Sequence, residues 1–370
     1  MRTGRFSVLS ALAVVFAWLS ALLLAQLADV ADYSGDNVWA YSIGSDGALK
    51  PITGSPFAAG SKPDSVAVDC RAKFVYVANG GGSNNVSAYS IAPNGALTPV
   101  PGSPFAAGSL PSSVVVSPTS KFVYVVNESG SNVSAYAIGS NGSLTPIPGS
   151  PFATGTDPHE MAIDPRGKFA YVANEVDNSV SAYRISSDGA LTPIPGSPFV
   201  AGSCPVAVVG DPLGRVVYVA NQASNNVSAY KIGSDGVLTP VPGSPFGSGI
   251  APFSITLDPT AKFAYVVNEG GNNISAYTIG SDGALMPIQS SPFAAGSDPH
   301  KIAVDPTATF AYVVNEVSND VSAYRIGPDG ALTPIPGSPL IGGIGPYAVA
   351  TDPTGKFVYV ANRGSPYPER

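Results

Sequence analysis

A four-residue motif, Tyr-Val-Ala/Val-Asn, recurs along this chain of 370 residues at a nearly constant interval. It begins at Tyr76, Tyr124, Tyr171, Tyr218, Tyr265, Tyr312 and Tyr359, so the interval is 48 residues once and 47 residues five times. A second motif of the form Asn-Val-Ser-Ala-Tyr also occurs seven times, and Gly-Ser-Pro-Phe or a close variant follows each copy. A repeat of this length is typical of folds built from one supersecondary unit that packs against copies of itself.

One repeat, residues 158–193, predicts four short strands. An Asp-Pro-Arg-Gly turn separates the first two apolar runs, and Asp188-Gly189 has the composition of a type I′ hairpin turn before the last. Pro193 in the last run fits only the edge of a sheet. The repeat therefore predicts a four-stranded antiparallel propeller blade with its last strand outermost. The four runs are Met161–Ile163, Phe169–Ala173, Val180–Ile185 and Leu191–Ile194.

The two ends of the repeat region complete each other. Residues 37–52 supply only the third and fourth strands of a blade, whereas residues 346–361 supply only the first and second. Together they make one shared blade, which closes a ring with six internal blades. We therefore expect an all-β protein, a seven-bladed β-propeller over residues 33–365, followed by a tail of residues 366–370.

The first 32 residues do not match the repeat. Arg2 and Arg5 precede an uncharged apolar stretch over residues 6–28, the pattern of an export signal. The stretch is also long enough to span a bilayer if it is not cleaved. We therefore expect residues 1–32 to be an export signal or membrane anchor plus a short linker. The protein is then expected outside the cytoplasm, with membrane contact only through residues 6–28.

Composition limits the ligands that such a propeller can bind. The net charge is −7, only 12% of residues are charged and no Lys/Arg cluster is present, which argues against nucleic acid. Cys70 and Cys204 fall at opposite ends of first strands three blades apart, too distant for the spacing of about 7 Å that a disulfide allows. The two histidines of the chain also cannot form a close zinc ligand set across a channel. We expect unpaired cysteines, no metal or other cofactor, and a monomer.

The positions that vary between repeats mark the candidate site. Because the first strand of each blade lines the channel, the residue after its proline lies at one rim. His159 and His300 occupy this position three blades apart and are expected to face each other across the channel, where imidazole suits proton transfer near neutral pH. The seven residues are Asp64, Ser112, His159, Val206, Phe253, His300 and Tyr347.

The motifs of the repeat resemble those of the 6-phosphogluconolactonase-like family of seven-bladed propellers. The resemblance rests on Tyr-Val-Ala-Asn with Asp-Pro-x-Gly-Lys-Phe before it and Asn-Val-Ser-Ala-Tyr after it, and it covers about residues 33–365. That group includes the YVTN-repeat proteins of microbial surfaces. The resemblance implies that acid–base and anion-holding groups converge at the mouth of the channel.

These arguments select two sets of candidate residues. The candidate catalytic residues are His159, His300, Glu160 and Lys301. The candidate binding residues are Lys62, Asp64, Asp157, Glu175, Phe253, Asp298, Glu316 and Tyr347. The histidines are separated by 141 residues, which is three repeats, and Arg184 returns at Arg325 in the same way. A duplicated three-blade block would therefore also explain the paired histidines, without any shared function. Glu128 and Glu269 occupy the same loop position as Glu175 and Glu316, where a solvated Glu needs no function.

Two functions remain open at this point. One is lactone hydrolysis, with His159 or His300 as general base and Lys301, Lys62 or backbone N–H groups stabilising the oxyanion. Because the predicted rim contains no Arg to clamp a phosphate, a neutral sugar lactone fits this function better than a phosphorylated one. The alternative is a non-catalytic periplasmic or cell-surface scaffold that binds a carbohydrate or a protein at the channel face.

Overall fold

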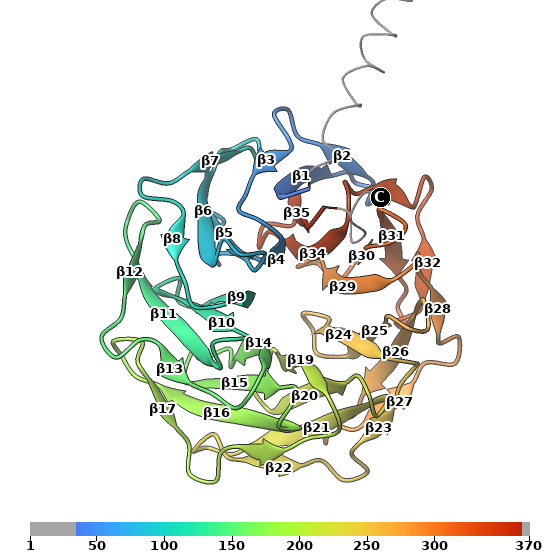
Figure 1. Ribbon diagram of the computed structural model, residues 1–370. Coiled ribbons are helices and arrows are strands. Elements are labelled where there is room, and N and C mark those ends of the chain that lie inside the picture. Colours follow the sequence, from blue (N-terminus) through green and yellow to red (C-terminus); the bar gives the residue numbers. More distant parts are fainter. Residues whose placement is uncertain (1–34, 365–370) are drawn as a thin grey trace, which may run out of the picture. The chain divides into compact units, whose positions relative to one another are not determined.

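Seven antiparallel sheets are arranged in a ring around a central channel (Figure 1). This computed structural model describes residues 35–364, so the segment 1–32 and the tail 366–370 of the sequence prediction lie outside the described residues. The prediction of a seven-bladed all-β propeller is confirmed. Within residues 35–364, no helix has the length and apolar character needed to cross a membrane.

The blades are numbered along the chain from residue 63, and blade 3 shows the arrangement that all of them share. Its strands are β14 (Pro158–Ile163), β15 (Phe169–Asn174), β16 (Ser179–Ile185) and β17 (Leu191–Pro193), paired in that order. β14 lies at the channel and β17, which carries Pro193, lies at the outer edge, as the sequence predicts (Figure 1).

The other blades repeat these four classes of strand. The first strands are β4 (Pro63–Val68), β9 (Pro111–Val116), β19 (Pro205–Gly210), β24 (Pro252–Leu257), β29 (Pro299–Val304) and β34 (Pro346–Thr351). The second strands are β5 (Phe74–Asn79), β10 (Phe122–Asn127), β20 (Val216–Asn221), β25 (Phe263–Asn268), β30 (Phe310–Asn315) and β35 (Phe357–Asn362). The third strands are β1 (Asn37–Ile43), β6 (Asn85–Ile91), β11 (Asn132–Ile138), β21 (Asn226–Ile232), β26 (Asn273–Ile279) and β31 (Asp320–Ile326). The fourth strands are β2 (Leu49–Pro51), β7 (Leu97–Pro99), β12 (Leu144–Pro146), β22 (Leu238–Pro240), β27 (Leu285–Pro287) and β32 (Leu332–Pro334).

Each blade also has a fifth, two-residue strand that the sequence reading did not predict. In blade 3 this is β18 (Phe199–Val200), which pairs with the start of β16 while β17 pairs with its end. The strand is held by the next blade, because Tyr230 of the Asn-Val-Ser-Ala-Tyr motif donates a hydrogen bond to the Val200 carbonyl at 2.6 Å. The fifth strands of the other blades are β3 (Phe57–Ala58), β8 (Phe105–Ala106), β13 (Phe152–Ala153), β23 (Phe246–Gly247), β28 (Phe293–Ala294) and β33 (Leu340–Ile341).

Both ends of the described chain build blade 7. β1 pairs with β35 over six residue pairs, from Asn37 with Asn362 to Ser42 with Phe357, and β35 pairs with β34. The predicted closure of the ring by a shared blade is therefore confirmed.

The tyrosine of each Tyr-Val-Ala/Val-Asn motif fastens its blade to the next one. Tyr171 is fully buried and its hydroxyl donates a hydrogen bond to the Gly236 carbonyl, in the hairpin turn of the following blade, at 3.0 Å. Gly236 has φ +91° and a Cβ there would lie 2.6 Å from the Phe169 ring, so only glycine fits the turn. The same bond recurs seven times around the ring, and Tyr312 and Tyr359 carry it across the shared blade to Gly47 and Gly95.

The Asp-Pro motif on the opposite face works as a turn. The buried Asp164 carboxylate accepts backbone hydrogen bonds from Arg166, Lys168 and Phe169. These bonds satisfy three N–H groups at the point where the chain reverses between β14 and β15.

Candidate functional site

A β-bulge in every blade directs one side chain into the channel. In β14 the pairing passes from Pro158–Asn174 to Glu160–Ala173, which leaves His159 as an extra, unpaired residue. The register shifts at the equivalent place in the other six blades. Bulges re-aim side chains, so the variable positions of the sequence form a ring at one mouth of the channel. We call Asp64, Ser112, His159, Val206, Phe253, His300 and Tyr347 the bulge ring, and the face that carries it the channel face.

A row of aromatic rings crosses the channel at the bulge ring. The Phe253 ring lies between the two imidazoles, with its centroid 5.4 Å from that of His159 and 4.6 Å from that of His300. The Tyr347 ring follows, 4.2 Å from His300. Both histidines therefore contact the same buried phenylalanine, Phe253.

The two histidines have opposite electrostatic environments. Burial, reinforced by the positive charges of Lys301 and Arg363, lowers the pKa of His159 to about 3, and its buried Nδ1 has no hydrogen-bond partner. Burial also acts to lower the pKa of His300, but hydrogen bonds to Asp298 and Glu316 outweigh it and raise that pKa overall. The His300 Nε2 lies 2.8 Å from Glu316 Oε2 and 3.7 Å from Asp298 Oδ2.

The candidate residues Glu160 and Lys301 bind each other. Lys301 Nζ lies 2.7 Å from Glu160 Oε1, and Glu160 Oε2 accepts the Val208 backbone N–H at 3.2 Å. The Lys301 ammonium also lies 6.0 Å from the centroid of the Phe253 ring. The charge of Lys301 is therefore already compensated within the channel.

The prediction that the rim contains no arginine is wrong. Arg363 directly follows β35, its Nε donates a hydrogen bond to the buried Asp64 carboxylate, and its guanidinium carbon lies 3.2 Å from the centroid of the Tyr347 ring. Arg363 lies outside the residues that flank the first-strand prolines, directly after Asn362 at the end of β35. The repeat did contain the signal, because Arg363 follows Asn362 as Glu175 follows Asn174 and Glu316 follows Asn315.

The residues after the second-strand asparagines form a second ring on the channel face. We call Gly80, Glu128, Glu175, Gln222, Glu269, Glu316 and Arg363 the loop ring. Gly80 is its only member without a side chain. A Cβ at Gly80 would lie 2.3 Å from Asp64 Oδ2 and 3.0 Å from the Pro111 carbonyl oxygen, so the Asp64 carboxylate occupies the space that a side chain would need.

Glu128 of the loop ring has an acidity suited to proton exchange. Its pKa is raised to about 7, chiefly by burial and also by the nearby carboxylates of Asp157, Asp64 and Glu175. The Arg363 guanidinium acts in the opposite direction but has the smaller effect. Burial also raises the pKa of Glu175 and of Glu269. The sequence pattern placed Glu128 on this face, but only the packing distinguishes it from the other glutamates.

The remaining predicted binding residues fall into separate groups. Asp157 and Glu175 surround Glu128, whereas Asp298 and Glu316 surround His300. Lys62 is exposed and forms no ion pair within residues 35–364. Four of the predicted binding residues thus lie in two groups, Asp157 and Glu175 near Glu128, and Asp298 and Glu316 near His300.

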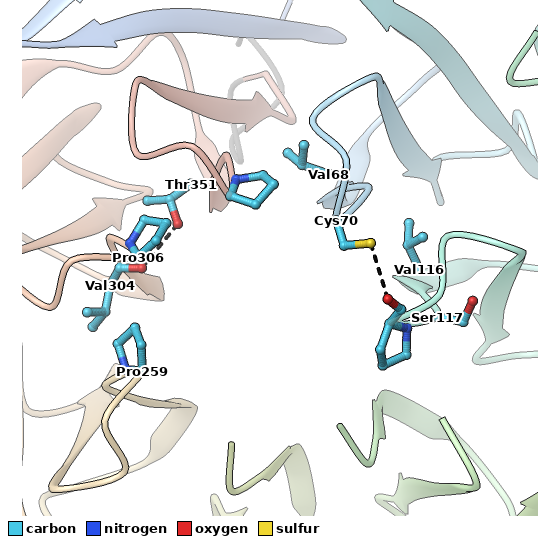
Figure 2. Close-up of a pocket in the computed structure, with 10 residues that line it drawn as sticks. Val68, Cys70, Val116, Ser117, Pro259, Val304, Pro306 and Thr351 are labelled. Carbon is cyan, nitrogen blue, oxygen red and sulfur yellow. Dashed lines mark hydrogen bonds between the residues drawn. The ribbon is translucent and has the colours of Figure 1, made fainter. Parts of the chain in front are cut away.

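The opposite mouth of the channel contains a different cavity, of about 360 Å³ (Figure 2). Its lining is mostly apolar, with prolines from the Asp-Pro turns, and Cys70 lies in it with Sγ 2.9 Å from Ser120 Oγ. Cys70 and Cys204 are both free thiols, so the prediction of unpaired cysteines is confirmed.

Solved structures with this fold come from several bacteria. A candidate 6-phosphogluconolactonase from Bacteroides fragilis shares 18% identity, with a TM-score of 0.73 over 86% of this chain and 99% of that one. The periplasmic gluconolactonase PpgL from Pseudomonas aeruginosa shares 17% identity, with a TM-score of 0.67 over 88% of this chain and 99% of that one. At such identities the likeness concerns the fold. No curated protein sequence matches this chain.

A sequence-family comparison gives the relationship directly. The family model described as lactonase, 7-bladed beta-propeller, matches residues 21–250 and 247–367, which is most of the chain. The seven blades, their closure through a shared blade and this match agree with the resemblance in the repeat motifs. The chain belongs to the lactonase family of seven-bladed β-propellers.

Proposed function

We propose that this protein hydrolyses an uncharged sugar lactone at the channel face, with Glu128 as general base and Arg363 as the group that stabilises the oxyanion. Membership of the lactonase family supports the reaction class. The similar fold of a protein named as a periplasmic gluconolactonase supports the substrate class.

The observation that carries the proposal is the way Arg363 is held. Its Nε donates a hydrogen bond to Asp64, and one face of its guanidinium stacks on the Tyr347 ring. These two contacts fix the plane of the guanidinium. Guanidinium has five N–H donors, so the four on the terminal nitrogens stay available, and they have no hydrogen-bond partner within residues 35–364. Donors fixed in advance are what a developing oxyanion requires.

Glu128 suits the proton transfer better than the histidines. A carboxyl with a pKa of about 7 is deprotonated in half of the molecules at neutral pH and is basic enough to accept a proton from water. His159, with a pKa of about 3, is a far weaker base, and its free Nδ1 is closed to water. His300 Nε2 already pairs with Glu316 and its Nδ1 is buried, so the proposal assigns proton transfer to Glu128.

The reaction balances with these two groups. Glu128 takes a proton from a water molecule as the water oxygen bonds to the lactone carbonyl carbon, and Arg363 donates hydrogen bonds to the carbonyl oxygen that becomes negative. Collapse of this intermediate breaks the bond between the carbonyl carbon and the ring oxygen. The ring oxygen then takes the proton from Glu128, and the product is the open hydroxy acid.

Charge on the channel face favours an uncharged substrate. The bulge and loop rings with their flanking residues hold eight carboxyl groups and three Lys or Arg side chains, and two of these cations are paired with carboxylates. A phosphate would be repelled by the surplus of negative charge. The carboxyl groups belong to Asp64, Glu128, Asp157, Glu160, Glu175, Glu269, Asp298 and Glu316, and the cations are Lys62, Lys301 and Arg363.

The proposal is tested by lactone ring opening measured as proton release. The wild type is expected to hydrolyse glucono-δ-lactone with saturation, and Arg363→Met is expected to lose about 100-fold or more in kcat. Arg325→Met is the matched control, because Arg325 also stacks on a ring, that of Phe310, but is exposed and lies on the third strand β31. Hydrolysis no faster than the uncatalysed reaction, or an equal loss in both variants, would contradict the proposal and leave the non-catalytic binding scaffold as the better account.

A further inference from the structure

We propose that Glu269, Asp298 and His300 form a binding site for one first-row divalent cation, with Glu316 as a fourth donor. The site lies on the channel face beside the proposed catalytic groups, but it does not depend on lactone hydrolysis. The sequence reading expected no metal because it considered the two histidines as a pair. The structure instead groups one histidine with carboxylates from the neighbouring strands.

The donor atoms converge on one point. One ligand atom from each of Glu269, Asp298 and His300 lies within 4.8 Å of the other two. Donors at about 2.1 Å from one tetrahedral zinc ion lie about 3.4 Å apart, so the three would have to close by at most about 1.4 Å on binding. Glu316 Oε2 adds an oxygen 2.8 Å from His300 Nε2.

His300 is a buried polar side chain that points into this cluster. It is 5% exposed, and its Nε2 is the atom that faces Glu316 and Asp298. Imidazole favours zinc and other late first-row ions, whereas carboxylate favours manganese and magnesium. One nitrogen with two or three carboxylate oxygens therefore fits Mn²⁺ or Zn²⁺ better than Ca²⁺, which prefers six to eight oxygen ligands.

Charge and a supporting hydrogen bond also favour a cation. The carboxyl groups of Glu269, Asp298 and Glu316 meet at a single histidine, so a dication would compensate the charge that they carry together. The Gln222 amide donates to Glu269 Oε2 at 2.9 Å, and the Glu269 side chain also interacts with that of Asp298. Hydrogen bonds of this kind orient metal ligands and strengthen binding.

The equivalent residues three repeats earlier provide an internal control. Three repeats earlier, Glu128, Asp157, His159 and Glu175 correspond to Glu269, Asp298, His300 and Glu316. Within the described residues, His159 forms no ion pair with these carboxylates, and the position of Gln222 is taken by Gly80. The site is therefore expected at His300 alone, although both blocks contain the same residue types.

The test is metal binding to the purified full chain after treatment with a chelator. Mn²⁺ binding is followed by the loss of the free-ion paramagnetic resonance signal, and Zn²⁺ binding by calorimetry. One ion per chain is expected, with affinity lowered at least about tenfold in Asp298→Asn and in Gln222→Ala. Asp157→Asn is the matched control and is expected to keep the wild-type affinity. Circular dichroism verifies that each variant is folded.

A spectroscopic measurement identifies the nitrogen ligand. Electron spin echo modulation of bound Mn²⁺ is expected to contain a nitrogen coupling that disappears in His300→Gln. No saturable binding of Mn²⁺ or Zn²⁺ by the wild type, an equal loss of affinity in Asp157→Asn, or a nitrogen coupling that persists in His300→Gln would each overturn the proposal. The assay requires no lactone, so its outcome is separate from that of the proposed hydrolysis.

Discussion

Lys301 Nζ lies 2.7 Å from Glu160 Oε1, although the two residues are 141 positions apart in the chain and come from blades on opposite sides of the channel. They occupy the same position of the repeat, one residue after His300 and His159. Equivalent positions of two blades thus carry opposite charges and bind each other across the channel. A direct link of this kind joins blades that are not neighbours in the ring (Figure 1).

The link predicts a stability effect for Lys301→Met. Removing the ammonium leaves the mostly buried Glu160 carboxylate without its partner, and the expected cost is about 1–3 kcal/mol of unfolding free energy. The double variant Glu160→Gln/Lys301→Met is expected to regain part of this loss, since no unpaired charge remains. Urea unfolding of the wild type, the double variant and the two single variants Lys301→Met and Glu160→Gln measures the coupling. A loss in the double variant equal to the sum of the two single losses would show that the ion pair contributes nothing.

The pKa of Glu128 predicts the pH dependence of hydrolysis. A general base must be deprotonated, and burial raises the pKa of Glu128 to about 7, so kcat/KM is expected to rise with pH through about 7 and then level off. Asp157→Asn removes a neighbouring negative charge that raises this pKa, so the rise should move to lower pH. Rates are corrected for uncatalysed ring opening in the same buffers. An unshifted profile in Asp157→Asn would assign the titration to another group.

Gly80→Ala is predicted to displace Arg363 indirectly, through Asp64. The new Cβ would lie 2.3 Å from Asp64 Oδ2, so Asp64 must move and its hydrogen bond with Arg363 is lost. We expect about 1–3 kcal/mol of destabilisation and a fall in kcat in the direction of that of Arg363→Met. Gly82→Ala is a nearby control for loop substitution, because a Cβ there meets nothing within 4 Å, although its φ of +96° adds backbone strain. Wild-type kcat in Gly80→Ala would show that Asp64 does not position Arg363.

The hydrogen bond of Tyr171 to the next blade predicts that its removal lowers the free energy of unfolding. Tyr171→Phe removes the hydroxyl that binds the Gly236 carbonyl and leaves that buried acceptor unsatisfied, at a cost of about 1–2 kcal/mol. Tyr183→Phe is the comparison, because its hydroxyl binds the Ala153 carbonyl closer to the outer edge of the blade, where water can replace it. Thermal unfolding of both variants tests whether the first loss exceeds the second.

The fold could be predicted from the sequence because the motifs that specify turns and strand edges occur in seven copies. Asp-Gly or Asn-Gly pairs mark the hairpins, Pro193 and its equivalents mark the outer edge, and the incomplete units at the two ends imply the shared blade. The two-residue β18 was missed because so short a strand has no periodicity of its own. It exists through its pairing with β16 and its contact with Tyr230 of the next blade.

The candidate site was only partly predictable, for two physical reasons. The position in the repeat predicts which residues lie on the channel face, but it does not predict which of their side chains form ion pairs. Glu160 and Lys301 form such a pair. Electrostatic environment also depends on packing: His159 and His300 stand in nearly identical sequences, yet the pKa of one is lowered and that of the other raised. Arg363 was overlooked for another reason, because it follows the last strand of the ring and was not aligned with the equivalent glutamates.

The most direct test of the account is the hydrolysis of glucono-δ-lactone by the wild type and by Glu128→Gln, measured side by side as proton release at pH 7. Gln keeps the size of the side chain and removes its ability to take a proton. The account predicts saturable hydrolysis by the wild type and a loss of about 100-fold or more in kcat for Glu128→Gln, with unchanged folding. Wild-type turnover in Glu128→Gln, or no turnover in either protein, would contradict it.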